Sequence, residues 1–395
     1  MAVTETHAPL SAEERAEKRK LMLRDAIALI SLFILTAALA IVTYALFASF
    51  TRHRDALARR WQATGERELR EGHPTQAVDA LSSALEYGPG RRDIEIELAS
   101  ALAAAGRNRE ATAYFNSLLD AQPGNGEIHL DLARIAAKEG NATLAEEHYQ
   151  RALDGTWEGD GYVRRRNVRL EMAGYLISRE DYTRAQTELR TASGNAPNDP
   201  AIQLQIAFLM EQARDPLDAL NIYRSQIRRR DATADTFEGL GRTAYALGWI
   251  TTARDALQVA TVTRGFTAQS KTARDAVRQM LADATHILDL YPSPDLKVRA
   301  RAIRVLNAAK TARSRLSGCF ASANVSGEMA DLQNKWTQVP ARLSVSVLER
   351  DPQLEQTTIS LVYETEQQTA QTCGAPTGDD ALLLKIAQAP LAVRQ

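Results

Sequence analysis

The chain has 395 residues, and its 48 basic and 49 acidic side chains leave a net charge of −1. This balance argues against nucleic acid as the main partner, and a hydrophobic content of 45% excludes a wholly disordered chain. Aromatic residues make up only 6%, which favours helices over a β-sandwich. With two cysteines and no Cys-x-x-Cys pair, we expect no structural zinc or iron–sulfur site.

The N-terminal region predicts a membrane anchor. Residues 1–25 are polar and are expected to form a cytoplasmic tail, whereas residues 26–51 contain no charged side chain. As a helix these residues would span about 39 Å, which exceeds the roughly 30 Å hydrocarbon core of a bilayer. We therefore expect a transmembrane signal-anchor at 26–51.

Two questions about this anchor stay open. Residues 38–40 satisfy the small-x-small pattern of a cleaved signal peptide, but the apolar run continues for ten residues beyond them. An uncleaved anchor therefore fits better. Five basic residues precede the span and six follow it closely, so the positive-inside rule gives no orientation. Because long downstream domains translocate largely regardless of charge, we expect a single-pass protein of the inner (plasma) membrane with the rest of the chain in the periplasm or another extracytoplasmic space.

A fixed spacing recurs between residues 58 and 267. An alanine followed four positions later by a bulky apolar residue returns every 34 residues, except for one interval of 40. From the second unit on, an apolar residue followed by a small one stands thirteen positions before this alanine. Each unit therefore predicts two amphipathic helices, with small residues where the helices cross closely. The alanines are Ala77, Ala111, Ala145, Ala185, Ala219 and Ala253.

These units resemble the tetratricopeptide repeat (TPR), whose pattern is W-x2-L-G-x2-Y…A-x3-F…P. Trp61, Gly65, Ala77, Leu81 and Pro89 match it in the first unit, and similar matches recur in the next units. The resemblance implies an all-α fold, a right-handed superhelix of helical hairpins, in a membrane-anchored and bacterial TPR protein. The six units are 58–91, 92–125, 126–159, 166–199 (which ends near Pro197), 200–233 and 234–267.

Two segments depart from this phase. Residues 160–165 are an insertion beside several glycines, which we expect to bulge from one face or bend the array. Residues 268–294 lose the spacing but still have a helical pattern, and they are expected to be capping helices.

The TPR resemblance also implies a binding site. In that family the first helix of each repeat lines a concave groove that binds a protein or peptide partner. Gln62 and Glu66 occupy two places of the lysine–asparagine set that clamps free acidic C-termini, so binding of that kind is not expected. The groove residues transferred from the register are Arg59, Gln62, Glu66, Arg134, Lys138, Leu204, Phe208, Glu238, Arg242 and Tyr245, with Arg70, Asp93, Ile96, Ser100, Glu127, Leu130, Asn167, Leu170, Gln212 and Asp235 beside them. Phe208 and Tyr245 could share one apolar pocket or pack between helices.

Residues 295–395 predict a small helical module. Its first helix, 295–316, contains seven basic residues, which could form an anionic-lipid or acidic-partner surface, although a solvated face is favoured. Helical patterns follow at 327–337, 352–369 and 379–387, and the acidic residues among them could fold back on the basic helix. Cys319 and Cys373 could stay free. Because a signal-anchor would place them in an oxidising compartment, we favour a disulfide between them, which would stabilise the fold by about 4 kcal/mol in the chain-entropy model.

Nothing in the sequence nominates catalytic chemistry. The common nucleotide, hydrolase and zinc-protease motifs are missing, and His129 and His148 have no third metal ligand in view. We therefore expect no catalytic residue, no cofactor and no metal. The leading hypothesis is a non-enzymatic TPR adaptor that gathers proteins at the cell envelope. The alternative is an enzyme or regulator whose active part is the 295–395 module, with the repeats used for docking.

Overall fold

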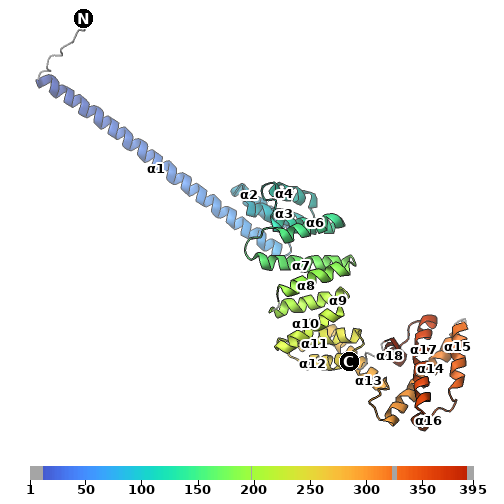
Figure 1. Cartoon of the computed structure of the whole chain (residues 1–395). Coiled ribbons are helices and arrows are strands. Elements are labelled where there is room, and N and C mark those ends of the chain that lie inside the picture. The colour runs from blue at the N-terminus through green and yellow to red at the C-terminus, as the bar shows by residue number, and fades with distance from the viewer. Residues whose placement is uncertain (1–11, 197, 323–326, 389–395) are drawn as a thin grey trace, which may run out of the picture. The chain divides into compact units, whose positions relative to one another are not determined.

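The computed structural model describes residues 12–196, 198–322 and 327–388 (Figure 1). Within these ranges the chain forms eighteen α-helices and one short 3-10 helix, and its only β-type pairing is a bridge between Asn125 and Thr156. The all-α fold of helical hairpins is therefore confirmed. The first residues of the polar tail, Pro197 and the residues after 388 lie outside the described ranges. The chain divides into two compact units, Met1–Gly161 and Tyr162–Gln395.

The first unit begins with a single long helix, α1 (Ala12–Arg70). The uncharged segment 26–51 and the helix that opens the first repeat are parts of this one helix, with no turn between them (Figure 1). Large apolar side chains such as Phe33 and Tyr44 are each 74% exposed. Within the described residues, α1 is the one helix long and apolar enough to cross a membrane, and a signal sequence would have the same features.

Three helical hairpins complete the first unit. The end of α1 packs on α2 (Pro74–Tyr87), α3 (Arg92–Ala104) on α4 (Asn108–Ala121), and α5 (Gly126–Lys138) on α6 (Ala142–Asp154). The alanines of the repeat, Ala77, Ala111 and Ala145, are all fully buried, because the paired helices approach closely there. Each hairpin turns at a glycine with a positive φ of 75–81°, a conformation that side chains rarely adopt (Gly72, Gly106 and Gly140).

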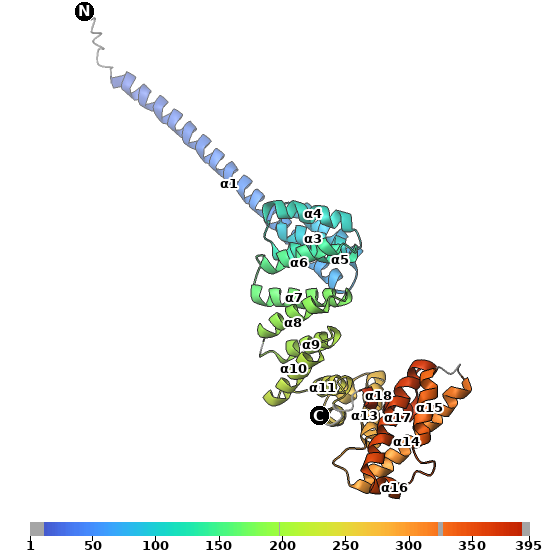
Figure 2. The same cartoon turned by 45° about the vertical axis from the view of Figure 1, so that its right-hand side comes forward.

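Three further hairpins open the second unit (Figure 2). They are formed by α7 (Gly161–Ser178) and α8 (Tyr182–Gly194), α9 (Pro200–Gln212) and α10 (Pro216–Arg229), and α11 (Ala234–Ala246) and α12 (Ile250–Val262). Residues 161–165 of the insertion form the first turns of α7, which makes that helix 18 residues long, instead of the bulge that the sequence suggested. The equivalent turn residues are Glu180 (φ 62°), Arg214 (φ 58°) and Gly248 (φ 76°), so two of the three turns hold a side chain in the left-handed region.

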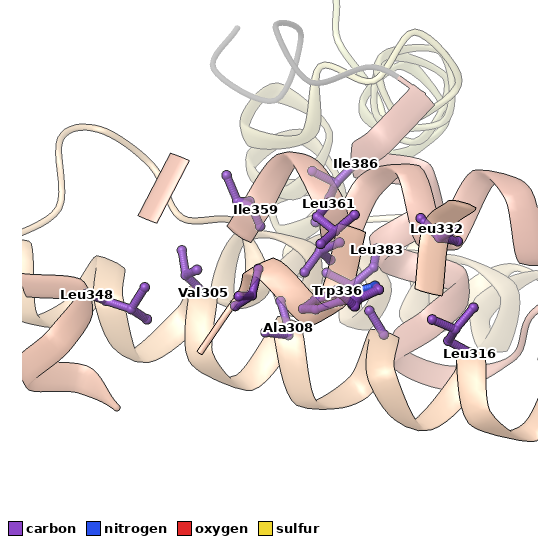
Figure 3. Close-up of a cluster of buried hydrophobic side chains, with 14 of the residues drawn as sticks. Val305, Ala308, Leu316, Leu332, Trp336, Leu348, Ile359, Leu361, Leu383 and Ile386 are labelled. Atoms are coloured by element: carbon purple, nitrogen blue, oxygen red, sulfur yellow. The ribbon is translucent and has the colours of Figure 1, made fainter. Parts of the chain in front are cut away.

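Two helices after the repeats lead to the C-terminal module. The 3-10 helix η1 (Phe266–Ala268) and α13 (Lys271–Leu290) pack against α12. The module consists of α14 (Val298–Ser322), α15 (Gly327–Gln338), α16 (Val345–Arg350), α17 (Pro352–Cys373) and α18 (Gly378–Gln388). Figure 3 shows its apolar core, in which Val305, Trp336, Ile359 and Leu383 come from four different helices.

The basic face of α14 packs against acidic α17. Arg301 forms an ion pair with Glu355, and Arg315 lies 3.7 Å from a carboxylate oxygen of the fully buried Glu366. A disulfide between Cys319 of α14 and Cys373 at the end of α17, with Cα atoms 5.7 Å apart, joins the same two helices. The charge of α14 is therefore used mainly for contacts inside the module.

Candidate functional site

Gln62 is the best-connected of the groove residues that the sequence nominates in the first unit. Its Nε2 donates hydrogen bonds to Glu97 (2.9 Å) and Asp93 (3.3 Å), and the guanidinium of Arg91 donates to its Oε1 at 2.8 Å. Burial raises the pKa of Glu97, whose second carboxylate oxygen accepts no hydrogen bond from any described residue. Gln62 therefore links the first two repeats through a polar network.

The other nominated side chains of the first unit stay close to water. Glu66 pairs with Arg70 at 3.6 Å, Arg134 with Asp131 at 2.9 Å, and Lys138 is exposed. The register placed them on the first helices of their repeats, as expected, but the structure does not gather them into one apolar cavity.

Of the five main groove residues nominated in the second unit, four meet in one cleft, and Asp235 from the additional set joins them. Leu204 and Phe208 come from α9, and Glu238 and Arg242 come from α11. The cleft has a volume of about 380 Å³, and Phe208 is 49% exposed, so about half of this large aromatic side chain faces water. We call this feature the α9–α11 cleft; its lining is Ala201, Leu204, Gln205, Phe208, Tyr223, Asp235, Glu238 and Arg242.

Arg242 is held in the cleft by two carboxylates. Its Nε and Nη2 donate to the two oxygens of Glu211, both at 2.9 Å, and its Nη1 donates to Glu238 at 3.3 Å. Burial opposes the charged form, but the hydrogen bonds to Glu211 outweigh it and raise the pKa of Arg242. The guanidinium lies 5.8 Å from the ring centre of Phe208, within cation–π range. The charged wall of the cleft is therefore fixed before any partner arrives.

Tyr245, the fifth nominated residue, lies elsewhere. The ammonium group of Lys385 on α18 stands 3.6 Å from the centre of its ring, and the ring packs against the core of the C-terminal module. Burial raises the pKa of Tyr245 to about 12 and lowers the pKa of Lys385. Tyr245 thus joins the repeats to α18 and does not line the cavity with Phe208.

Besides Ala201 and Gln205, sequence reasoning missed three residues whose hydrogen bonds shape the α9–α11 cleft. Glu211 stands one position before the nominated Gln212, and Tyr223 is a core position of the repeat whose hydroxyl nevertheless donates to Glu211 at 2.6 Å. Gln269, which follows η1, donates to Asp235 at 2.9 Å and to Glu238 at 3.0 Å. The repeat pattern marks the positions of Glu211 and Tyr223, whereas no periodic signal reaches Gln269.

Two clusters resemble metal ligands only in part. The Nδ1 atoms of His129 and His148 lie 3.1 Å apart, and Nε2 of His129 lies 2.9 Å from the carbonyl oxygen of Pro123. Burial lowers the pKa of His148, which favours the neutral form of that ring. Glu68, Glu71 and His73 lie close together near the surface of the first unit, a common arrangement without an ion.

The C-terminal module places the buried Glu366 beside the partly buried Asp380. Glu366 of α17 is fully buried, and neither of its oxygens accepts a hydrogen bond from a described residue. Arg315 uses its donors for the hydroxyl of Thr369 (2.9 Å) and the carbonyl of Gly374 (2.8 Å). Burial and the neighbouring carboxylate of Asp380 raise the pKa of Glu366 to about 8. This pair is a structural junction between α17 and α18, with no nucleophile beside it among the residues named here.

Comparison with known families identifies the hairpins. A family model described as tetratricopeptide repeat matches residues 63–126 and again residues 96–160. Residues 63–160 of the chain therefore match the tetratricopeptide repeat family. The match covers the three TPR hairpins of the first unit, and the hairpins α7–α12 continue their spacing with the same buried alanines (Ala185, Ala219 and Ala253). No curated protein matches the chain.

Several solved TPR structures are similar to part of the chain. PilF of Pseudomonas aeruginosa is 18% identical, covering 53% of this chain and 92% of its own, with a TM-score of 0.39. PilW, described as a type IV pilus biogenesis factor, is 16% identical, covering 56% and 98%, with a TM-score of 0.42. A TPR protein from Parabacteroides merdae is 17% identical, covering 58% and 84%, with a TM-score of 0.36.

Proposed function

We propose that this TPR protein is a non-enzymatic, membrane-anchored scaffold that holds a protein partner at the cell envelope. The observation that carries the proposal is the α9–α11 cleft, where the half-exposed ring of Phe208 lies beside a charged cluster that is already ordered. Exposed aromatic anchors next to fixed charges are typical of binding hot spots. Repeat arrays of paired helices commonly present such surfaces to partners.

The anchor and the compartment are part of this proposal. The exposed apolar side chains of α1 favour a lipid environment. The disulfide between Cys319 and Cys373 suits an oxidising compartment, which supports repeats on the periplasmic side of the inner membrane. Protease added to spheroplasts should then digest the repeats. Repeats that stay protected until lysis would place the scaffold on the cytosolic face.

Site-specific crosslinking in cells tests the binding site. A photo-crosslinking residue at Gln205, which lines the α9–α11 cleft, should capture a partner. The same residue at Gln258, on the exposed surface of α12, is the matched control and should not.

Side-chain truncation separates binding from folding. Phe208→Ala should abolish capture at Gln205 with little effect on thermal stability, because about half of the ring is already in water. Val262→Ala, at an 81% exposed position, should leave capture unchanged. If a folded Phe208→Ala protein still captured the partner, the binding surface would lie outside this cleft. Arg242 is unsuitable for this test, since its loss would leave Glu211 unpaired.

A further inference from the structure

The charges of the α9–α11 cleft are unbalanced. Glu211, Asp235 and Glu238 contribute three carboxylates, whereas Arg242 contributes one guanidinium, so these four groups together have a net charge of two negative units. Arg242 makes its two shortest bonds to Glu211. Asp235 and Glu238 are held together by the neutral amide of Gln269 instead. The α11 wall of the cleft therefore has an excess of negative charge.

Gln269 adds an unused acceptor to the same wall. Its Nε2 donates to both carboxylates, but its buried Oε1 receives no hydrogen bond from any residue that the structure describes. The carboxylates of Asp235 and Glu238 thus lie together on the cleft wall as hydrogen-bond acceptors, held by Gln269. A guanidinium, with five N–H donors in a planar fork, can donate to several such acceptors at once, and a bidentate pair is stronger than a neutral contact.

The α9 wall has an apolar stripe, although Gln205 also lines it and Glu211 of the same helix binds Arg242. Ala201, Leu204 and Phe208 are spaced by three and four residues, which places them on one face of the helix. A segment that lies between α9 and α11 therefore meets an apolar surface on one side and carboxylates on the other.

We propose that the partner segment presents an arginine, or less favourably a lysine, to Asp235 and Glu238, with a neighbouring apolar side chain against Leu204 and Phe208. This inference rests on the proposed function, because it assumes that the cleft binds a protein partner. An acidic segment is disfavoured, since it would bring a further negative charge to carboxylates that already outnumber the single guanidinium of Arg242.

Two synthetic peptides test the charge preference on the full chain in phosphatidylcholine nanodiscs. Both are fluorescein-labelled amphipathic peptides with the same leucine positions; one has arginines and the other has glutamates on its polar face. We expect fluorescence anisotropy to show binding of the arginine peptide that weakens with added salt, and no binding of the glutamate peptide. Empty nanodiscs report any binding to the lipid.

Substitutions in the cleft test whether the arginine peptide binds there. The double variant Asp235→Asn/Glu238→Gln should weaken binding of the arginine peptide at least tenfold. Its matched control, Glu86→Gln/Asp120→Asn, removes the same charge from exposed positions of the first unit and should not weaken binding. Phe208→Ala should weaken binding by a similar factor, because it removes the apolar wall.

The outcomes separate this inference from the proposed function. Unchanged binding in the Asp235→Asn/Glu238→Gln variant, together with a loss in Phe208→Ala, would overturn the cationic preference while leaving the cleft as a binding site. Equal or tighter binding of the glutamate peptide would overturn it as well. Failure of the arginine peptide to bind would also refute it, and crosslinking at Gln205 would still decide the function independently.

Discussion

Gly239 lies where helix α11 crosses the ring of Tyr223. A Cβ atom at this position would stand 2.3 Å from Cζ and 2.6 Å from the hydroxyl oxygen of Tyr223, closer than real contacts allow. The ring is 1% exposed and its hydroxyl is bonded to Glu211, so the ring cannot shift without disturbing that contact. Gly239→Ala must therefore move the ring or push α10 and α11 apart.

The cost of Gly239→Ala follows from three contributions. Overpacking a core costs about 1–3 kcal/mol, and weakening the bond from Tyr223 to the carboxylate of Glu211 costs about 1.5–3 kcal/mol. Alanine gains about 1 kcal/mol over glycine within a helix. We therefore expect a net loss of about 3 kcal/mol in the free energy of unfolding, or about 6–12 °C in Tm for a unit of this size.

Two further glycines give this prediction its controls. Gly174→Ala in α7 adds a Cβ with no atom within 4 Å, so it should stabilise the protein by about 1 kcal/mol. Gly241→Ala meets the Cγ of Leu257 at 2.5 Å, but a leucine side chain can shift, so its cost should lie between the other two. Urea unfolding followed by circular dichroism measures all three. A Gly239→Ala protein as stable as wild type, or a Gly174→Ala protein that is less stable, would refute the reasoning.

Three other measurements test the structure. Glu180→Gly should raise the free energy of unfolding by about 0.5–1 kcal/mol, because glycine adopts the φ of 62° without strain; an unchanged urea midpoint would contradict this. Glu366, with its pKa raised to about 8 from an ordinary 4.5, holds a proton that the unfolded chain releases, so stability should fall by up to about 1.4 kcal/mol per pH unit between these values. Glu366→Gln should remove that slope in melting curves recorded from pH 5 to 8. Non-reducing peptide mapping should find Cys319 linked to Cys373, and alkylation of both without reductant would exclude the bond.

The boundaries of the repeats were predictable from the sequence because the spacing of small residues follows from how the helices pack. Position eight of every unit is glycine or alanine, and at Gly65 and Gly241 a Cβ would stand 2.5 Å from the leucine of the facing helix. Close crossings of this kind recur with the period of the hairpin, so the sequence shows them. The same periodicity placed Leu204, Phe208, Glu238 and Arg242 on the faces that meet in the α9–α11 cleft.

The remaining features depend on contacts that have no period. Tyr245 stands at a groove position of its repeat. However, α18 follows more than a hundred residues later and places Lys385 over the ring of Tyr245. Residues 161–165 of the insertion extend α7 instead of bulging, because a helix can lengthen at its N-terminus without disturbing the pairs further along. Glu180 and Arg214 stand where the other hairpin turns have glycine. Only the backbone geometry reveals that they adopt the same left-handed conformation as those glycines.

Because helix α1 is unbroken, it fixes the angle about its own axis at which the three hairpins of the first unit project from the apolar segment. Residues 26–50 of the helix are uncharged, and from Arg54, which donates to the carbonyl of Tyr87 at 3.0 Å, the helix belongs to the first hairpin. Because an α-helix turns by about 100° per residue, one alanine inserted between these positions would swing the three hairpins by about 100° and move them by about 1.5 Å. The direction in which these hairpins face is therefore encoded in the exact number of residues that separates Phe50 from Arg54.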